Sequence, residues 1–409
     1  MDYASLLSRV YALGTRGIEL GLDRVRAAAD ALGAPDRVLR CAQIAGTNGK
    51  GTAAVLVEGC ARASGLSTGL FTSPHLHRYT ERFRVNGVEV DPAELAPHLA
   101  RALALTDPPS CLPLTFFEAT TVAALGLFAE RAVELAVLEV GLGGRLDATS
   151  VAAPAVTAIT SIGLDHAEWL GPTLAHVARE KAGVARPGIP LVVGPLSAEA
   201  LAEVERVAAS VGAPVELCGR DFAVDDGLVL PWPGRHQREN AAVAGAVCDV
   251  LGRADPRLSK AALAWAASTA IWPGRYEEIP GRPLHVLDGA HNAEATAALV
   301  AALEERGRGV DAILFGACRD KPVSAMLDLL APLGSPLVLA PPPLARAFDP
   351  SAHAARPGTT VAPDVRSALE RCRALAPRGG AVLVTGSLFT VAEARRVLLG
   401  VRADAPIGL

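Results

Sequence analysis

The clearest candidate for chemistry is a glycine-rich turn, Ala45-Gly46-Thr47-Asn48-Gly49-Lys50-Gly51-Thr52. Its three glycines allow backbone N–H groups to turn toward an anion, while Lys50 supplies a positive charge and Thr52 a hydroxyl for Mg²⁺. Residues 38–45 before the turn are strand-like, and residues 52–63 after it have a helical pattern. This is the context that a phosphate-binding loop requires, so the turn predicts nucleotide binding.

The turn departs from the usual P-loop spacing at two positions. Ile44 stands where glycine is expected, and Gly51 separates Lys50 from the hydroxyl of Thr52. Clusters of Gly, Asn and Thr also occur in ordinary strand-to-helix turns. Taken alone, the turn leaves both interpretations open, and other segments must decide between them.

Two polar segments follow predicted strands and could contribute metal ligands. Glu139 ends an apolar run, where a parallel strand delivers its residues to a ligand crevice, and burying a carboxylate there without a partner is costly. This favours a metal ligand over a solvated charge. His166 could ligate a second divalent ion with Asp165 as its charge partner, but a simple helix cap at Asp165 is equally consistent with the sequence.

Lys181 and Asn240 have both a structural and a functional interpretation. Lys181 lies near a predicted helix end, where a cation is favourable, but it could instead carry a carbamate formed with CO₂ and so become an anionic metal ligand. Asn240 opens a long Ala/Val helix and could contact an adenine or phosphate edge, or merely supply polarity at the helix start. The sequence alone decides neither case.

A second group of polar residues lies near the middle of the chain. Asp288 and His291 follow another apolar run, at the position from which an aspartate could hold a ribose hydroxyl. Arg275, shortly before it, could reach a phosphate across a cleft between two domains.

The elements that must position these residues alternate between apolar runs and helical patterns, which predicts doubly wound parallel sheets. A hairpin is predicted over residues 82–90, around Asn86-Gly87. Two Pro/Gly pairs over residues 271–283 suggest a boundary, after which the βαβ pattern restarts as a smaller unit. The predicted strands are residues 40–45, 68–72, 135–140, 155–160, 189–193, 284–287, 312–315, 337–340 and 381–385.

Composition limits the class of protein. A chain of 409 residues suits two domains, and 4% aromatic residues with abundant Ala, Leu, Val and Gly favour α/β packing over an aromatic-rich sandwich. A net charge of −4 without a basic stripe argues against nucleic acid, and no leader or membrane-spanning run is evident, so we expect a cytoplasmic protein. Seven scattered cysteines are predicted to be buried thiols, not bridges or metal ligands. They are Cys41, Cys60, Cys111, Cys218, Cys248, Cys318 and Cys372.

Taken together, these segments resemble the folylpolyglutamate synthase / dihydrofolate synthase family, a branch of the Mur ligase superfamily of ATP-dependent amide-forming enzymes. Gly51, which is irregular in a P-loop, is typical of this branch. The resemblance spans nearly the whole chain and includes residues 17–25, 46–52, 72–76, 115–118, 139–147, 161–166, 180–183, 272–275, 288–292 and 386–388.

The resemblance implies an N-terminal P-loop-type domain (1–273) that binds ATP and pterin, and a smaller Rossmann-like glutamate-ligase domain (274–409). Lys50, His166 and Lys181 are its candidate catalytic residues. The ATP site would comprise Gly46, Thr47, Asn48, Gly49, Lys50, Gly51, Thr52, Asn240, Arg275 and Asp288. Of these residues, Arg275 and Asp288 would reach ATP only when the two domains close. The metal site would comprise Thr52, Ser73, Glu139 and His166, and we expect it to hold two Mg²⁺ ions. The pterin site would comprise Ile18, Glu19, Leu20, Gly21, Thr72, Ser73, Pro74, His75, Phe116, Phe117, Glu118 and Asp147. His291 and Ser387 would lie near glutamate.

The implied reaction transfers the ATP γ-phosphoryl group to a pterin-substrate carboxylate, and the glutamate amine then displaces phosphate from the acyl phosphate. The chain departs from the family at Thr52 (usually serine), at Ser150 (usually asparagine) and at Pro322, where a second aspartate is usual. Residues 17–25 resemble those of bifunctional members, so we expect both synthase activities, and a monofunctional folylpolyglutamate synthase is the alternative. A nucleotide-gated switch and a Mur-type ligase for a nucleotide-sugar peptide are weaker alternatives. With no exposed apolar stripe evident, we expect a monomer.

Overall fold

The computed structural model describes residues 2–404, which divide into two compact units. The first comprises residues up to 75 together with 79–231 and 237–270. The second comprises residues 76–78, 232–236 and 271 onward. Each unit has its own sheet and its own hydrophobic core.

The first unit is built on an eight-stranded sheet in the order β4-β3-β2-β5-β1-β6-β7-β8. All neighbours from β2 to β8 are parallel, and the predicted hairpin adds β3 and β4 as an antiparallel edge. The strands are β1 (Cys41–Ala45), β2 (Thr68–Phe71), β3 (Phe83–Val85), β4 (Val88–Glu89), β5 (Leu135–Glu139), β6 (Pro154–Ile159), β7 (Leu191–Val193) and β8 (Val215–Leu217).

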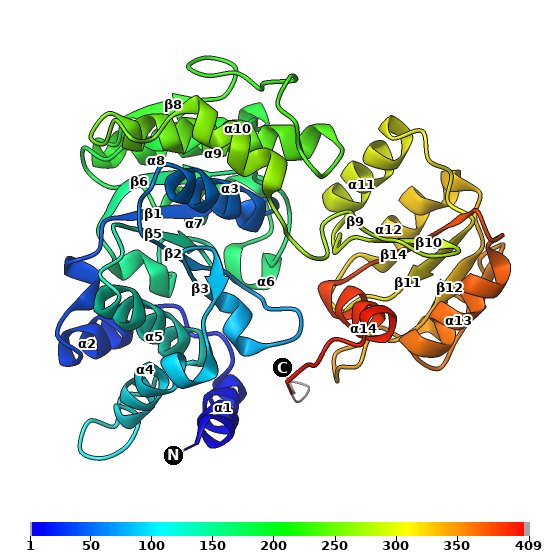
Figure 1. Ribbon diagram of the computed structural model, residues 1–409, viewed down its shortest axis with the longest axis horizontal. Helices are drawn as coiled ribbons and strands as arrows, with labels where there is room; N and C mark the ends of the chain where they lie inside the picture. Colours follow the sequence, from blue (N-terminus) through cyan, green and yellow to red (C-terminus); the bar gives the residue numbers. More distant parts are fainter. Residues whose placement is uncertain (1, 405–409) are drawn as a thin grey trace. The chain divides into compact units, whose positions relative to one another are not determined.

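Helices cover both faces of this sheet, as expected of strands that are buried on both sides. Figure 1 shows α3, α9 and α10 gathered on one side and α4 and α5 on the other. The helices are α1 (Tyr3–Ala12), α2 (Asp23–Ala31), α3 (Lys50–Ala63), α4 (Pro92–Ala104), α5 (Phe116–Glu130), α6 (Ala167–Leu170), α7 (Leu174–Ala182), α8 (Ala198–Val211), α9 (Arg235–Gly252) and α10 (Lys260–Thr269).

The second unit is built on a six-stranded sheet in the order β13-β12-β11-β14-β10-β9, parallel except at β9. Val286 and Leu383 pack with α11 and α12, while Leu287 and Val384 pack with α13 and α14 on the other face. The elements are β9 (Glu277–Ile279), β10 (Leu284–Leu287), α11 (Ala293–Glu305), β11 (Ala312–Phe315), α12 (Val323–Leu330), β12 (Leu337–Leu339), β13 (Thr359–Val361), α13 (Val365–Leu375), β14 (Ala381–Thr385) and α14 (Leu388–Leu399).

The predicted strands are all present, with ends that differ by at most two residues. Three short strands were not predicted: β8, β9 and β13. Each is a three-residue edge strand, partly exposed, so it lacks the apolar run that marks a central strand. The hairpin turn is as expected, with positive φ at both Asn86 (50°) and Gly87 (77°).

The prediction for the cysteines is wrong at two positions. Cys111 is exposed and Cys218 is half-buried, whereas the other five thiols are buried, and none of the seven forms a disulfide in the part of the chain that the structure describes. Cys111 follows Pro108-Pro109 in the loop after α4, so its neighbours in sequence do not carry it into a core.

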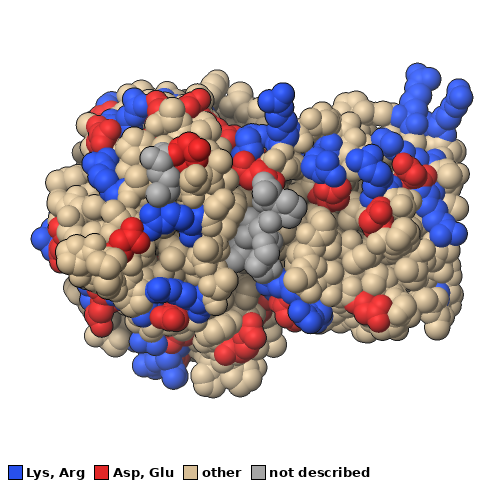
Figure 2. Space-filling view, turned by 90° about the horizontal axis from the view of Figure 1, so that it is seen from below, with Lys and Arg blue, Asp and Glu red and all other residues tan. Residues whose placement is uncertain are grey.

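Charges of both signs are interspersed on the face shown in Figure 2. Within residues 2–404, no helix combines the length and apolarity needed to cross a membrane.

Candidate functional site

The predicted phosphate loop lies at the C-terminal edge of the first sheet, between β1 and α3. Its conformation requires two of its glycines. Gly46 has a φ of 148°, and a Cβ there would lie 1.9 Å from Thr160 Oγ1. Gly49 has a φ of 85°, and its Cβ would lie 2.0 Å from Asn240 Oδ1. The left-handed backbone conformation and the lack of space therefore each exclude a side chain at Gly46 and Gly49.

Hydrogen bonds to the end of β6 hold this loop in place. Thr47 N donates to Ser161 O (2.8 Å), and Asn48 N donates to Ser161 Oγ (2.9 Å). The hydroxyl of Thr160 donates back to Asn48 O (2.6 Å), and Thr47 Oγ1 accepts from Gly163 N (3.0 Å). The loop is thus hydrogen-bonded to the sheet edge along residues 47 and 48.

Two lysines meet at one carbonyl of the loop. Lys50 Nζ donates to Gly46 O (3.0 Å) and Thr47 O (3.2 Å), and Lys181 Nζ on α7 donates to Gly46 O (2.8 Å). Lys181 is only 5% exposed. Burial, with the neighbouring Lys50 charge second, lowers the pKa of Lys181 to about 7. Lys50 therefore places a positive charge at this loop, which suits a polyanion.

The strand order sets the candidate metal ligands beside the loop. Ser73 follows β2, Glu139 ends β5, the phosphate loop follows β1 and Ser161 follows β6, and these four strands are neighbours in that order. Glu139 is paired in register with Ile44, and its Oε2 accepts the backbone N–H of Ser73 (2.9 Å). Glu139 is 5% exposed. A buried carboxylate therefore lies at the sheet edge next to the loop.

The other predicted ligands are less uniform. Thr52 is buried in the first turn of α3. His166 is exposed, has a positive φ of 53° and occupies the N-cap of α6, where its backbone N–H donates to Asp165 Oδ1 (2.9 Å). Within residues 2–404, no group of three or more His, Cys, Asp and Glu side chains is arranged to hold a metal ion. The predicted metal ligands are not a group of that kind, because Thr52 and Ser73, two of the four, would bind through hydroxyl oxygens.

Asn240, a predicted ATP contact, lies beside the phosphate loop. It is buried on α9, its Oδ1 lies against Gly49, and its Nδ2 donates to Gln237 Oε1 (3.2 Å). The structure therefore brings Asn240 to the phosphate loop across almost 200 positions of sequence, an approach that no local pattern indicates.

Two of the predicted pterin residues, His75 and Phe116, belong to an aromatic cluster. His75 lies 6.0 Å from Tyr79, and Phe116 stacks on Tyr11 at 5.9 Å between ring centroids. Arg82 donates from Nε to His75 Nδ1 (2.8 Å) and lies over the Phe116 ring at 5.2 Å. Burial lowers the pKa of Arg82. Tyr11, Tyr79 and Arg82 were not predicted, because the long-range contacts that collect them have no signature in sequence.

Arg24 connects the two outer parts of the predicted pterin site. It donates from Nη2 to Glu19 O (2.7 Å) and pairs with Glu118 through Nη2 (2.9 Å). Glu118 also closes a capping box with Thr115 at the start of α5. Arg24 therefore ties the loop at residues 18–21, where Ile18 and Leu20 are exposed, to α5. Arg24 was not predicted as a site residue, because its partner Glu118 lies 94 positions away in the sequence.

Asp147 and Phe117 both contact the glycine-rich loop after β5. Asp147 accepts the backbone N–H groups of Gly141 (3.0 Å) and Leu142 (2.9 Å), and burial raises its pKa. Its carboxylate thus shapes the glycine-rich loop after β5. Phe117 packs against Gly141, where a Cβ would lie 2.5 Å from its ring, so the same loop lies close to α5.

The remaining candidates lie at the C-terminal edge of the second sheet. Asp288, after β10, accepts the backbone N–H groups of Tyr276 (2.8 Å) and Ala290 (2.9 Å). Arg275 Nη1 approaches Gly289, where a Cβ would lie 2.7 Å away. His291 Nδ1 bonds Gly289 O (2.9 Å), and Ser387 is the N-cap of α14. Arg275, Asp288 and His291 are therefore neighbours, and Ser387 follows the adjacent strand β14.

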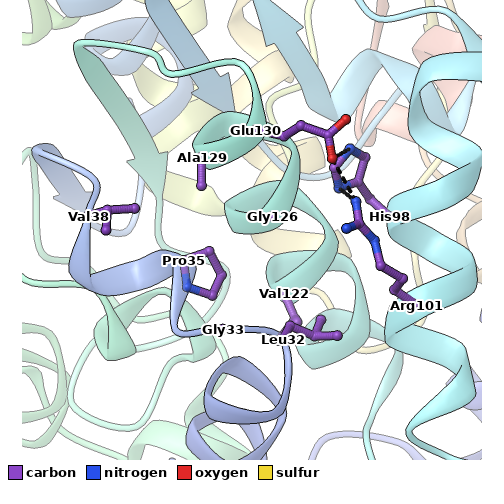
Figure 3. A pocket seen from close by; sticks show the side chains of 10 residues that line it. All are labelled: Leu32, Gly33, Pro35, Val38, His98, Arg101, Val122, Gly126, Ala129 and Glu130. Carbon is purple, nitrogen blue, oxygen red and sulfur yellow. Dashed lines mark hydrogen bonds and ion pairs between the residues drawn. The ribbon is translucent and has the colours of Figure 1, made fainter.

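In the first unit, a separate cleft of about 220 Å³ lies between α4, α5 and the turn after α2, toward the end of α5 that is opposite Phe116 and Phe117 (Figure 3). There Arg101 Nη2 bonds both His98 Nδ1 (3.0 Å) and Glu130 Oε2 (2.9 Å). None of the predicted site residues lines this cleft.

Comparison with known proteins places this geometry in context. Residues 274–388 match the model of the Mur ligase, glutamate ligase domain. The dihydrofolate synthase/folylpolyglutamate synthase of Escherichia coli is 35% identical over 97% of this chain and 95% of its own length. Another relative is the probable bifunctional folylpolyglutamate synthase/dihydropteroate synthase of Haloferax volcanii, which is 33% identical over 97% of this chain. This chain spans only about half of that relative's length, with 50% covered.

Two solved structures are similar along their whole length. The E. coli FolC complex with DHPP and ADP has a TM-score of 0.89 at 32% identity, and covers 97% of each chain. The bifunctional folylpolyglutamate synthase/dihydrofolate synthase from Yersinia pestis, complexed with AMPPNP and Mn ion, has a TM-score of 0.86 at 33% identity and covers 97% of this chain and 98% of its own. Both relatives bind an adenine nucleotide, and one also binds a divalent metal.

Proposed function

Because the chain belongs to the family of folylpolyglutamate synthases and dihydrofolate synthases, we propose that it is an ATP-dependent ligase that joins L-glutamate to dihydropteroate, to the γ-carboxylate of a folate, or to both. The observation that carries the proposal is the phosphate loop at residues 46–52. Gly46 and Gly49 admit no side chain, and two lysines converge on Gly46 O. A carboxylate is a poor acyl donor, and ATP supplies its activation.

The reaction proceeds in two transfers. The carboxylate of the pterin substrate, which is dihydropteroate or a folate and is called the acceptor of glutamate below, attacks the γ-phosphorus of ATP. This step releases ADP and leaves an acyl phosphate. The glutamate amine then attacks the acyl carbon, forms the amide bond and displaces phosphate. Lys50 and the amides of the loop hold the phosphates and offset the charge on the transferring group, so the contribution of these residues is positioning and electrostatics.

The donors at the sheet edge fit a hard divalent cation. Thr52, Ser73 and Glu139 offer oxygen atoms, which Mg²⁺ prefers, whereas the His166 imidazole would complete a second site. When bound, Mg²⁺ offsets the charge of the nucleotide phosphates. The backbone N–H of Ser73 donates to Glu139 Oε2 and so fixes the orientation of the Glu139 carboxylate.

Lys181 is proposed to react with CO₂ to give a carbamate. Its neutral amine would form a bond to the carbon of CO₂ and release one proton to solvent, which changes a cation into an anion. A pKa of about 7 leaves much of this amine neutral at neutral pH. Mass measurement on the intact protein in bicarbonate at neutral pH tests the assignment, with Lys181→Arg as the control. An unmodified mass under those conditions contradicts it.

The division of labour follows the predicted boundary. We propose that residues 1–273 bind ATP through the loop and Asn240, and hold the pterin against His75, Phe116, Phe117 and the loop at residues 18–21. Residues 274–409 receive glutamate near His291 and Ser387, while Arg275 and Asp288 contact ATP. A monomer in the cytoplasm completes the proposal, and sedimentation of the purified chain tests its oligomeric state.

The decisive experiment measures ADP release with ATP, glutamate and one acceptor, comparing dihydropteroate with tetrahydrofolate. Release that requires both glutamate and an acceptor, with a product heavier by one glutamyl group, supports the proposal. Activity with both acceptors indicates a bifunctional enzyme, and activity with tetrahydrofolate alone indicates a monofunctional folylpolyglutamate synthase. ATP hydrolysis that is indifferent to acceptor and glutamate supports a nucleotide-gated switch instead.

A further inference from the structure

The turn at residues 274–276 carries Arg275, the proposed contact to ATP, and its backbone is strained. Tyr276 has a φ of 41°, although its side chain is bulky and only 4% exposed. A left-handed conformation is unfavourable for such a residue, so it persists only where the surrounding structure fixes it. Gly274 is also left-handed, with a φ of 72°, and a Cβ there would lie 3.1 Å from Val391 Cγ1 on α14. Other elements of the second unit therefore hold this turn in its conformation.

Hydrogen bonds meet at Gly274 from both sides. Its backbone N–H donates to Glu277 Oε2 (2.9 Å), on β9. Its carbonyl oxygen accepts from Gly289 N (2.9 Å) and from Arg275 Nη1 (3.1 Å). Because Gly274 directly precedes Arg275 and also accepts from its guanidinium, a change in the orientation of the Gly274 backbone would move that guanidinium.

A second contact fixes Glu277 itself. Arg395, on α14, donates from Nε to both carboxylate oxygens of Glu277 (2.9 and 3.0 Å). The side chains of Arg395 and Glu277 are 18% and 20% exposed, so salt screens this ion pair less than it screens an exposed pair. An ionised carboxylate is also a stronger acceptor for the backbone N–H of Gly274 than a neutral group. Glu277 therefore links α14 to the turn that carries Arg275.

We propose that Glu277 is a positioning residue: held by Arg395, it fixes the turn at residues 274–276 and so directs Arg275 toward the phosphates of ATP. The inference rests on the proposed function, in which Arg275 contacts ATP. A guanidinium that must meet phosphate oxygens gains from being oriented beforehand, because misplacement by about 1 Å can cost roughly 100-fold in rate. Arg275 touches the nucleotide, and Glu277 acts only through it.

The neighbouring Glu278 provides a matched control. It is the next residue of β9, and successive side chains of a strand point to opposite faces of the sheet. Its Oε1 lies 3.9 Å from Arg306 Nε and 3.8 Å from Arg308 Nε, two residues that follow α11. Glu277 and Glu278 therefore share a strand, a charge and partial burial, but Glu277 is the one that accepts from Gly274 N.

The test measures ATP affinity by calorimetry and kcat/KM for ATP in Glu277→Ala, in Arg275→Ala and in the double variant. We expect Glu277→Ala to lower both quantities roughly 10-fold, and Arg275→Ala to lower them at least as much. In the Arg275→Ala background, Glu277→Ala should cause no further loss, because a positioning residue acts only through the group that it positions. A residue that merely stabilises the second unit would cause the same loss in both backgrounds. Glu278→Ala should match wild type.

Glu277→Gln keeps an oxygen for Gly274 N but loses the charge that pairs with Arg395. It should show a smaller loss that again disappears in the Arg275→Ala background, and it replaces Glu277→Ala if thermal unfolding shows that variant to be unfolded. Unchanged ATP affinity and kcat/KM, or equal losses with and without Arg275, overturn the assignment. Because calorimetry needs no turnover, this result is separate from the proposed function, which fails if wild type shows no glutamate-dependent ADP release.

Discussion

At the scale of single residues, the candidate site depends on charges placed beside backbone groups. Lys50 and Lys181 both donate to Gly46 O, and Glu139 accepts from the backbone N–H of Ser73. These contacts orient each charged group before any substrate arrives. Pre-orientation of this kind is what makes electrostatic catalysis effective, because no reorganisation is needed during the reaction.

Replacing Lys50 tests the phosphate loop most directly. We expect Lys50→Ala to reduce glutamate-dependent ADP release by at least about 10²-fold, since a preorganised charge on the transferring phosphoryl group is lost. The fold should persist, because Lys50 bonds only carbonyls of its own loop. Lys260→Ala, an exposed lysine at the start of α10, is the control. Normal turnover by Lys50→Ala would refute the phosphate role of the loop.

Glu139→Gln tests the metal assignment at the same scale. Glutamine keeps an oxygen that can accept from Ser73 N but loses the charge that attracts a cation. The Mg²⁺ concentration for half-maximal activity should rise roughly 10- to 100-fold. Glu370→Gln, at an exposed position on α13, should leave the Mg²⁺ titration unchanged. If both variants titrate like wild type, Glu139 is not a ligand.

At the scale of elements, the strand-to-loop junctions determine the shape of the site. Gly49 and Gly65 provide a matched pair, since their φ values are 85° and 84°. A Cβ at Gly49 would meet Asn240, whereas nothing lies within 4 Å at Gly65. Gly65→Ala therefore bears only the backbone penalty, on the order of 1 kcal/mol. Gly49→Ala should be less stable still and should lose ATP binding, as calorimetry and thermal unfolding would show. Equal effects of the two substitutions would contradict the packing of Asn240 on the loop.

The strand β10 contains a buried histidine that should make the stability of the second unit sensitive to acid. His285 is 3% exposed, its Nε2 accepts from Arg373 Nε (3.2 Å), and burial, with Arg373 second, lowers its pKa to about 4. Between pH 6.5 and about 4 the unfolded chain binds the proton that the folded chain excludes. Stability is therefore full above pH 6.5 and falls as the pH drops toward 4.

Substitution of His285 isolates this effect. Burial also lowers the pKa of His77 to about 4, and that of His98, so wild type should lose stability on acidification for several reasons. The loss between pH 6.5 and 4 should be smaller in His285→Gln, as measured by denaturant unfolding at each pH. Parallel pH profiles for the variant and wild type would show that His285 does not titrate in this window.

At the scale of the whole molecule, each of the two units has its own sheet and core, so each should fold independently. We expect residues 271–409, produced alone, to unfold in one cooperative transition and to release no ADP, because the phosphate loop lies in the other unit. Calorimetry and circular dichroism provide the measurement. A fragment without a cooperative transition would indicate that its core depends on the first unit.

The chain order of apolar and helical patterns was sufficient to predict both parallel sheets, the Asn86-Gly87 hairpin and the strand ends that carry Glu139 and Asp288. These features depend on residues close in sequence, so local pattern contains them. The three edge strands were missed because partial exposure removes their apolar signature. Similarly, Cys111 showed that apolar neighbours in sequence do not ensure burial.

By itself, the sequence determined the chemistry available to this protein: a glycine-rich loop with a lysine and a hydroxyl, and carboxylates at strand ends. Only the tertiary structure decided which of these groups meet. It placed Asn240 over Gly49, Lys181 at Gly46 O and Arg24 between Glu19 and Glu118, and it joined Glu277 to both Gly274 and Arg395. The physical reason is that contacts between distant segments depend on strand order and helix packing, which a linear pattern does not specify.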